Sequence, residues 1–294
     1  MTPNDFAVRS QKGILILDGA TGSNLRRMGM PVGVSTEQWV YEHPEAILKL
    51  QRAYVDAGSD IIYAPTFMAN RLGLGMHGLE DRLTALNRGL VALSRQAADG
   101  RAWVAGDITT TGKPLDPVGP MRYETLFDIY REQIEVLVEA GVDLLVAETM
   151  LSVDETVCAV EAARSVCDLP VMCSLTMEAD GHLLFGGSAA EAVEVLQAVG
   201  ASAVGLNCSV GPDQLESVVR GMKAVAEVPV IAKPNAGLPV MDAQGMAHYS
   251  MSPDDFAVAM ARLVDAGAGI VGGCCGTDPD YIRALSSAVH TGRQ

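Results

Sequence analysis

The segment "RYETLFDIYREQIEVLVEAGVDLLVAET" (122–149) contains one complete helix-to-strand unit of the 294-residue chain. Its first part (122–141) repeats apolar residues at helical spacing and ends in Gly141, a residue type that commonly stops helices. The apolar run "DLLVAET" (143–149) follows, and its length is typical of a strand buried on both faces. The segment therefore predicts one amphipathic helix followed by one buried strand.

The same plan recurs along the whole chain. Short apolar runs lie at 13–20, 60–66, 103–109, 143–149, 171–177, 203–209, 230–237 and 269–277. Segments of helical period lie at 43–58, 122–141, 152–166, 188–200, 211–227 and 252–267, with a last helix expected near 278–290. Such alternation predicts a parallel sheet with right-handed crossovers. Eight units in under 300 residues favour an α/β fold of the (β/α)8 TIM-barrel type, as a single domain over 1–294. A doubly wound open sheet is the alternative.

Charge, apolar runs and cysteine content indicate which partners and which cellular compartment the sequence disfavours. The chain has 21 basic and 36 acidic residues, a formal charge of -15, which disfavours binding to nucleic acid or to an anionic membrane. No signal peptide or membrane-spanning run is visible in the sequence. Its six cysteines do not resemble the disulfide framework of a small secreted domain. We expect a cytoplasmic protein with reduced thiols; the sequence leaves its oligomeric state open.

Small and polar residues stand where the apolar runs stop. In a TIM barrel these strand ends surround the active site. The candidates on position are Asp18, Gly19, Ala20, Thr66, Asp107, Glu148, Asn207, Cys208, Asn235, Cys274 and Cys275.

Three of the cysteines point to a metal site. Cys208 ends the sixth run, and "GGCCGT" (272–277) places Cys274 and Cys275 at the end of the eighth. Strands 6 and 8 of a barrel are separated by one strand, so the three thiols can converge. A catalytic zinc keeps three protein ligands and an open position, and it would suit a thiol substrate. Buried packing thiols are the alternative, and we assign that role to Cys158, Cys167 and Cys173.

Seven motifs together resemble the homocysteine S-methyltransferase family: "LDGATGSNL" (17–25), "PTFMAN" (65–70), "GDITTTGKPLDPVG" (106–119), "AETM" (147–150), "GLNCSVGP" (205–212), "KPNAGLP" (233–239) and "GGCCGT" (272–277). The resemblance runs from Lys12 to His290. It implies a zinc-bearing barrel in which Cys208, Cys274 and Cys275 bind Zn2+ and the zinc binds homocysteine as a thiolate.

The resemblance also implies contacts to the amino acid. Asp18, with the backbone around Gly19 and Ala20, and Glu148 would hold the amino group, and Asn235 would contact the zinc or the amino acid. Local alternatives exist for several positions. Asp18 would cap a helix at 21–28, Glu148 would pair with a lysine or arginine, and Asn207 would bond the backbone at a turn. Thr66 is a candidate on position alone.

The sequence motifs indicate the methyl donor less clearly than the methyl acceptor. The motifs are closest to the homocysteine-binding module of cobalamin-dependent methionine synthase, which predicts a methylated corrinoid protein, carrying methylcobalamin, as a separate donor. Betaine enzymes of the animal type hold the quaternary ammonium with aromatic side chains. Here Met68 and Thr149 occupy two of those aromatic positions, and Trp39 does not align with a third. Betaine and S-methylmethionine remain the alternative donors.

Two other classes of protein fit parts of the pattern. One is a thiol redox enzyme, although no C-x-x-C motif is present. The other is a non-catalytic protein with a structural zinc, which would normally be closed by four strong ligands. Only three such cysteines can be placed together. The sequence therefore favours a cytoplasmic transferase that methylates homocysteine to methionine and whose partners are homocysteine and a methyl donor.

Overall fold

The computed structural model describes residues 1–242 and 247–291 and contains an eight-stranded, all-parallel sheet in the order β1-β10-β7-β6-β5-β4-β3-β2. A parallel bridge between Leu17 and Ile61 joins the two ends of this order, so the sheet closes into a barrel. Closure excludes the open sheet and confirms the (β/α)8 fold. The strands are β1 (Leu15–Ile16), β2 (Ile61–Tyr63), β3 (Trp103–Thr109), β4 (Leu144–Met150), β5 (Val171–Leu175), β6 (Ala203–Cys208), β7 (Val230–Pro234) and β10 (Ala268–Val271).

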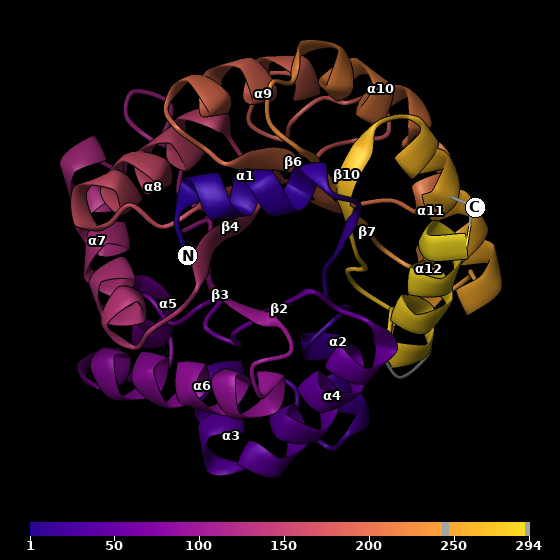
Figure 1. Ribbon diagram of the computed structural model, residues 1–294. Helices are drawn as coiled ribbons and strands as arrows, with labels where there is room; N and C mark the ends of the chain where they lie inside the picture. The colour runs from indigo at the N-terminus through magenta and orange to yellow at the C-terminus, as the bar shows by residue number, and fades with distance from the viewer. Residues whose placement is uncertain (243–246, 292–294) are drawn as a thin grey trace.

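Helices surround the barrel as an outer ring (Figure 1). The ring is formed by α4 (Pro44–Ala57), α6 (Leu83–Ala98), α7 (Tyr123–Glu139), α8 (Val153–Val166), α9 (Ala189–Ala198), α10 (Glu216–Val225), α11 (Pro253–Asp265) and α12 (Pro279–Thr291). Their apolar faces pack on the outside of the strands and form the larger of two core clusters. Cys158 and Cys173 are buried in that cluster and Cys167 packs against it, in agreement with a packing role.

The smaller core cluster fills the barrel itself. It contains Leu15, Leu17, Ile61, Leu144, Val146 and Ile231, so alternate residues of each strand point inward. The N-terminal helix α1 (Pro3–Gln11) crosses one end of the barrel, and its Phe6 is fully buried in the same cluster (Figure 1). This end of the barrel is therefore closed by apolar packing.

Several short elements lie in the loops that follow the strands. They are α2 (Gly22–Arg27), α3 (Thr36–Glu42), α5 (Arg71–Gly75), the 3-10 turns η1 (Glu80–Arg82) and η2 (Pro212–Gln214), and the antiparallel hairpin β8 (Pro239–Met241) and β9 (Ala247–Tyr249). The hairpin was not expected, because three-residue strands are too short to show an alternating pattern. The helix predicted over 211–227 is wrong at both ends: Pro212 opens a 3-10 turn, and Ala226 adopts an extended conformation after Val225.

Within the described residues, no helix combines the length and the apolar character needed to cross a lipid bilayer. The polar ends of the strands lie at the end of the barrel opposite α1, where the βα loops gather.

Candidate functional site

Side chains alternate in direction along each strand, and this alternation places a layer of polar residues above the apolar barrel interior. Val146 points into the barrel, and Glu148 follows two positions later on β4; Lys233 follows the inward Ile231 in the same way on β7. Because strand residues two apart share a face, these side chains also point toward the barrel axis. Tyr63 and Asp107 reach the same layer from β2 and β3.

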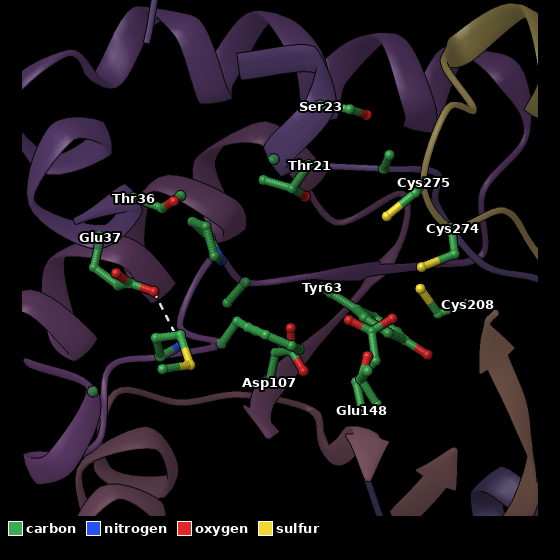
Figure 2. Close-up of a pocket in the computed structure, with 18 of the residues that line it drawn as sticks. Thr21, Ser23, Thr36, Glu37, Tyr63, Asp107, Glu148, Cys208, Cys274 and Cys275 are labelled. Atoms are coloured by element: carbon green, nitrogen blue, oxygen red, sulfur yellow. Dashed lines mark hydrogen bonds between the residues drawn. The ribbon is translucent and has the colours of Figure 1, made fainter. Parts of the chain in front are cut away.

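Three thiols meet at one side of this layer. The Sγ atoms of Cys208, Cys274 and Cys275 all lie within 4.8 Å of one another, and Figure 2 shows them directed toward a common point. The backbone is shaped for this convergence. Cys208 and Ser209 both have left-handed φ angles, 63° and 59°, which are uncommon for residues with a side chain and often mark functional sites. The Cys274 amide donates to Pro234 O at 2.7 Å, which ties the double-cysteine turn to β7.

Without a metal these thiols hold their protons tightly. The pKa of Cys208 is lowered by a hydrogen bond with Cys274 but raised by Cys275 and by burial, with a net value of about 11. The pKa of Cys274 is raised by a hydrogen bond with Cys208 and lowered by one with Cys275, the pKa of Cys275 is lowered by Cys208 and raised by Cys274, and with the added effect of burial both are about 12. The three thiols are partly buried and contact one another, and Lys233 lowers the pKa of Cys274 only slightly. A tetrahedral zinc with bonds of about 2.3 Å requires sulfurs about 3.8 Å apart, and the three Sγ atoms, all within 4.8 Å of one another, are close enough to fit such an ion.

A buried ionic cluster lies beside the thiols. Lys233 Nζ is 3.0 Å from Glu148 Oε1, 3.7 Å from Asp18 Oδ1 and 4.9 Å from the centre of the Tyr63 ring. Asp18 also accepts a hydrogen bond from the Tyr63 amide at 2.8 Å. Asp107 Oδ1 is buried and has no hydrogen-bond partner among the described residues. Asp18 and Glu148 pair with Lys233, whereas Asp107 forms no ion pair among the described residues, so the cluster is short of positive charge.

The pKa values reflect that shortage. Burial raises the pKa of Asp18 to about 7, although Lys233 opposes the shift. Burial, followed by the neighbouring Glu148, raises the pKa of Asp107 well above its usual range. Burial lowers the pKa of Lys233, but Glu148 and then Asp18 raise it by more, so the net shift is upward. Lys233 therefore stays charged, and the cluster favours a further cation.

A cavity of about 380 Å³ joins the thiols and the ionic cluster. Its inner wall contains Asp18, Asp107, Glu148, Lys233 and the three cysteines, together with Gly19 and Ala20. Its outer wall is more apolar and includes Val34, Phe67, Met68 and Met76. Such a volume and mixture of walls are typical of a small-molecule site.

The predicted residues fall into two groups. The cavity is lined by Asp18, Gly19, Ala20, Asp107, Glu148 and the three cysteines, whereas Thr66, Asn207 and Asn235 are not among its lining residues. The Thr66 hydroxyl donates to Asp107 O at 2.8 Å, and Asn207 bonds Thr149 through both of its amide atoms. Asn235 Nδ2 donates to Ser209 O at 3.1 Å, next to Cys208. Asn207 Nδ2 also donates to Cys274 Sγ at 3.8 Å, so these three residues support both the backbone around the cavity and one of the thiols.

The local alternatives raised for Asp18 and Glu148 have opposite outcomes. Thr21, not Asp18, is the N-cap residue of α2, and no side chain caps that helix. Glu148 does pair with a lysine, Lys233. In the outer region, Met68 and Thr149, which stand where animal betaine enzymes are expected to have aromatic residues, line the cavity. Trp39 stacks on His43 with ring centres 4.5 Å apart and is not among the lining residues.

Sequence reasoning missed three buried wall residues: Tyr63, Lys233 and Glu37. Glu37 on α3 is held by the Ser35 hydroxyl at 2.8 Å and accepts from the Met68 amide at 3.0 Å, an interaction drawn in Figure 2. A signal for Lys233 was present in the sequence. A lysine inside the apolar run "VIAKPNAG" (230–237) follows the inward Ile231 by two positions, and a lysine is rarely buried without an acidic partner.

Comparisons with known proteins agree with this geometry. The family described as "Homocysteine S-methyltransferase" matches residues 15–289. The chain is 30% identical over 294 residues to "Methionine synthase" from Mycobacterium leprae (strain TN), covering 94% of this chain and 24% of the relative. It is 31% identical over 300 residues to "Methionine synthase" from Mycobacterium tuberculosis (strain ATCC 25618 / H37Rv), covering 96% and 25%. The chain thus spans about a quarter of the length of these curated relatives.

Solved structures show the same fold. The homocysteine methyltransferase MmuM from Escherichia coli superposes in its oxidized form with a TM-score of 0.82, at 24% identity, over 98% of this chain and 99% of the other. Its metallated form gives a TM-score of 0.80 over 96% and 98%. With the family match over nearly the whole chain, these findings establish that the chain belongs to the homocysteine S-methyltransferase family of enzymes.

Proposed function

We propose that this protein is a zinc-dependent S-methyltransferase that converts homocysteine to methionine. The observation that carries the proposal is the convergence of three Sγ atoms within 4.8 Å on a cavity whose other wall is rich in carboxylates. The sulfur side of the cavity fits a thiol held on a metal, and the carboxylate side fits an ammonium group. Homocysteine carries both groups on one short chain.

Cys208, Cys274 and Cys275 would hold the zinc. A zinc ion with one open position lowers the pKa of a bound thiol and supplies a thiolate near neutral pH. All six cysteines are unpaired in the structure, as a thiolate site requires, and we place the enzyme in the reducing cytoplasm. The protein backbone would position the three sulfur ligands. The left-handed conformation of Cys208 and Ser209 orients one sulfur, and the hydrogen bond to the Pro234 carbonyl fixes the turn that carries the other two.

The ionic cluster orients the amino acid. Its three carboxylates and one lysine leave room for an added positive charge, so a bound ammonium group would be stabilised there. With the amino end fixed, the sulfur is held facing the outer part of the cavity. Transfer then needs only in-line approach of the donor. The sulfur lone pair forms the new S–C bond, and the donor keeps the electron pair of the bond that breaks.

The donor we propose is a methylated corrinoid carried by a separate protein. Two observations support it: the curated relatives are methionine synthases, and large apolar side chains are exposed on loops that follow the barrel strands. These side chains are Val34, Met76, Val118, Leu184, Phe185 and Leu238. We take these loops as the surface on which the corrinoid protein would dock.

Methyl transfer can be followed with a labelled methyl group. The zinc-loaded enzyme is incubated with homocysteine and, in separate reactions, with a methylated corrinoid protein, betaine or S-methylmethionine, each carrying a 13C methyl group. We expect labelled methionine with the corrinoid protein. Labelled methionine from betaine or S-methylmethionine alone would confirm the transferase but overturn the donor, and no methionine from any of the three would contradict the proposed function.

A further inference from the structure

A tyrosine outside the cavity contacts one of the three converging thiols. Tyr249, the last residue of β9, forms a side-chain hydrogen bond with Cys275. Its ring lies against the backbone of Gly276, where an added Cβ would be 2.3 Å from Tyr249 Cγ and where φ is 85°, in the left-handed region. Glycine at this position therefore lets the ring lie beside the turn that carries Cys275.

The hairpin that carries Tyr249 is connected to the same turn. The Ala236 amide donates to Cys275 O at 3.0 Å, and the Met251 amide donates to Ala236 O at 3.1 Å. Ala236 precedes β8 and Met251 follows β9, so both ends of the hairpin are fixed relative to Cys275. The contact between the tyrosine hydroxyl and the sulfur is therefore supported by the backbone on both sides.

The other two sulfurs each have a hydrogen-bond donor of their own. Asn207 Nδ2 donates to Cys274 Sγ at 3.8 Å. The Ser209 amide forms a hydrogen bond with the Cys208 side chain. None of Tyr249, Asn207 and Ser209 is among the residues that line the cavity, so the three donors reach the sulfurs from outside it.

These hydrogen bonds matter because a zinc ion that holds three cysteines and a thiol substrate would bring together four sulfur nucleophiles. A hydrogen bond to a thiolate stabilises its charge and lowers its pKa, and the nucleophilicity of a thiolate falls as its pKa falls. The substrate sulfur would enter from the cavity, on the side away from the three donors. It would therefore keep a nucleophilicity that the three protein sulfurs lose.

We propose that Tyr249, Asn207 and the Ser209 amide protect the three zinc-binding cysteines from methylation and so direct the methyl group to the substrate sulfur. This proposal rests on the proposed function, since it takes the three cysteines as zinc ligands. Tyr249 would act through Cys275, as a positioning residue that does not contact the substrate.

Methyl iodide, a small methyl donor, tests the proposal on the zinc-loaded protein without homocysteine. The sulfur lone pair forms the S–CH3 bond and iodide leaves with the electron pair, so each attacked cysteine gains one methyl group. Peptide mass spectrometry gives the methylation rate at each cysteine. For Tyr249→Phe, which removes only the hydroxyl, we expect methylation of Cys275 to be about tenfold faster, the usual scale for losing a hydrogen bond to a charged group, with Cys208 and Cys274 changed less than about twofold.

Tyr281→Phe is the matched control. It removes a hydroxyl that donates to Met251 O at 2.5 Å and not to a sulfur, so we expect wild-type rates at all three cysteines. Asn207→Ala is a second variant, measured with zinc in slight excess, and in this variant the increase should occur at Cys274. An increase at the same cysteine in Asn207→Ala and Tyr249→Phe would contradict the pairing of each donor with its own sulfur.

Addition of homocysteine to the same reaction tests the direction of transfer. We expect nearly all of the methyl group in methionine with the wild-type protein and a larger share on Cys275 with Tyr249→Phe. An unchanged rate at Cys275 in Tyr249→Phe, an equal increase at all three cysteines, or loss of zinc from this variant would overturn the proposal. A wild-type protein that retains no zinc would instead contradict the proposed function.

Discussion

Asn207 holds Thr149 through two hydrogen bonds that cross from β6 to β4. The Thr149 amide donates to Asn207 Oδ1 at 3.0 Å, and Asn207 Nδ2 donates to the Thr149 hydroxyl at 2.7 Å. Thr149 has a left-handed φ of 58°, which is unfavourable for a β-branched residue and needs external support. Since Thr149 directly follows Glu148, and Asn207 directly precedes Cys208, this pair connects the ionic cluster to the thiols.

We therefore expect Asn207→Ala to damage both parts of the site. The Thr149 amide loses its acceptor, and the free energy of unfolding should fall by about 2 kcal/mol, as for a buried polar group left unpaired. Zinc affinity and homocysteine affinity should fall together, because Glu148 and Cys208 both move. Urea unfolding and calorimetry check this. Unchanged stability with unchanged homocysteine binding would contradict the proposed link.

The three converging cysteines should each be needed for metal retention. Replacing Cys208, Cys274 or Cys275 with Ala leaves two sulfurs, too few for a tight zinc site. We expect the zinc content after dialysis to fall from about one per chain to near zero. Cys167→Ala is the control, since Cys167 lies at the end of α8 and packs against the outer core. If one of these three variants retained about one zinc per chain, the cysteine replaced in it would not be a zinc ligand.

Zinc binding should depend strongly on pH. In the metal-free protein the pKa values are about 11 for Cys208 and about 12 for Cys274 and Cys275, so all three thiols are protonated near neutral pH. Zinc binds the thiolates, so binding must displace about three protons, and the dissociation constant for zinc should fall as pH rises toward these pKa values. Calorimetry at pH 7.5 in two buffers of different ionisation enthalpy counts the protons. Release of one proton or none would show that the three cysteines do not act together.

Close packing between β6 and β7 supports Cys208 from below. A Cβ added at Gly205 would lie 2.0 Å from Ile231 O, so Gly205→Ala must push the two strands apart. We expect it to lower the free energy of unfolding by about 3 kcal/mol and to weaken zinc binding. Gly221→Ala on α10 is the control, because nothing lies within 4 Å of its added Cβ and a helix should gain about 1 kcal/mol. Equal stability of the two variants would contradict the close contact.

The sequence predicted the barrel well, because each strand run is bounded by a helix of clear period and the number of units matches a closed sheet. It also predicted the thiols, since Cys208 and the Cys274–Cys275 pair stand at the ends of nearby strands. The structure brings the three Sγ atoms within 4.8 Å of one another, and their role as zinc ligands stays a prediction.

The pairing inside the ionic cluster could not be predicted in the same way. Lys233, Glu148 and Asp18 come from β7, from β4 and from just beyond β1, and which carboxylate receives the lysine depends on side-chain reach across the barrel. The packing of α1 across one end of the barrel could not be predicted, because Phe6 is the one residue of this helix that is buried. Sequence periodicity reports which face of an element is buried, but not which distant partners meet there.

Zinc-edge X-ray absorption of the purified protein, with and without homocysteine, tests the central claim most directly. We expect about one zinc per chain with three sulfur neighbours, increasing to four when homocysteine is added, since the substrate thiolate takes the open position. Absence of zinc after metal repletion, or a coordination shell that homocysteine leaves unchanged, would contradict a thiol-activating metal site formed by Cys208, Cys274 and Cys275.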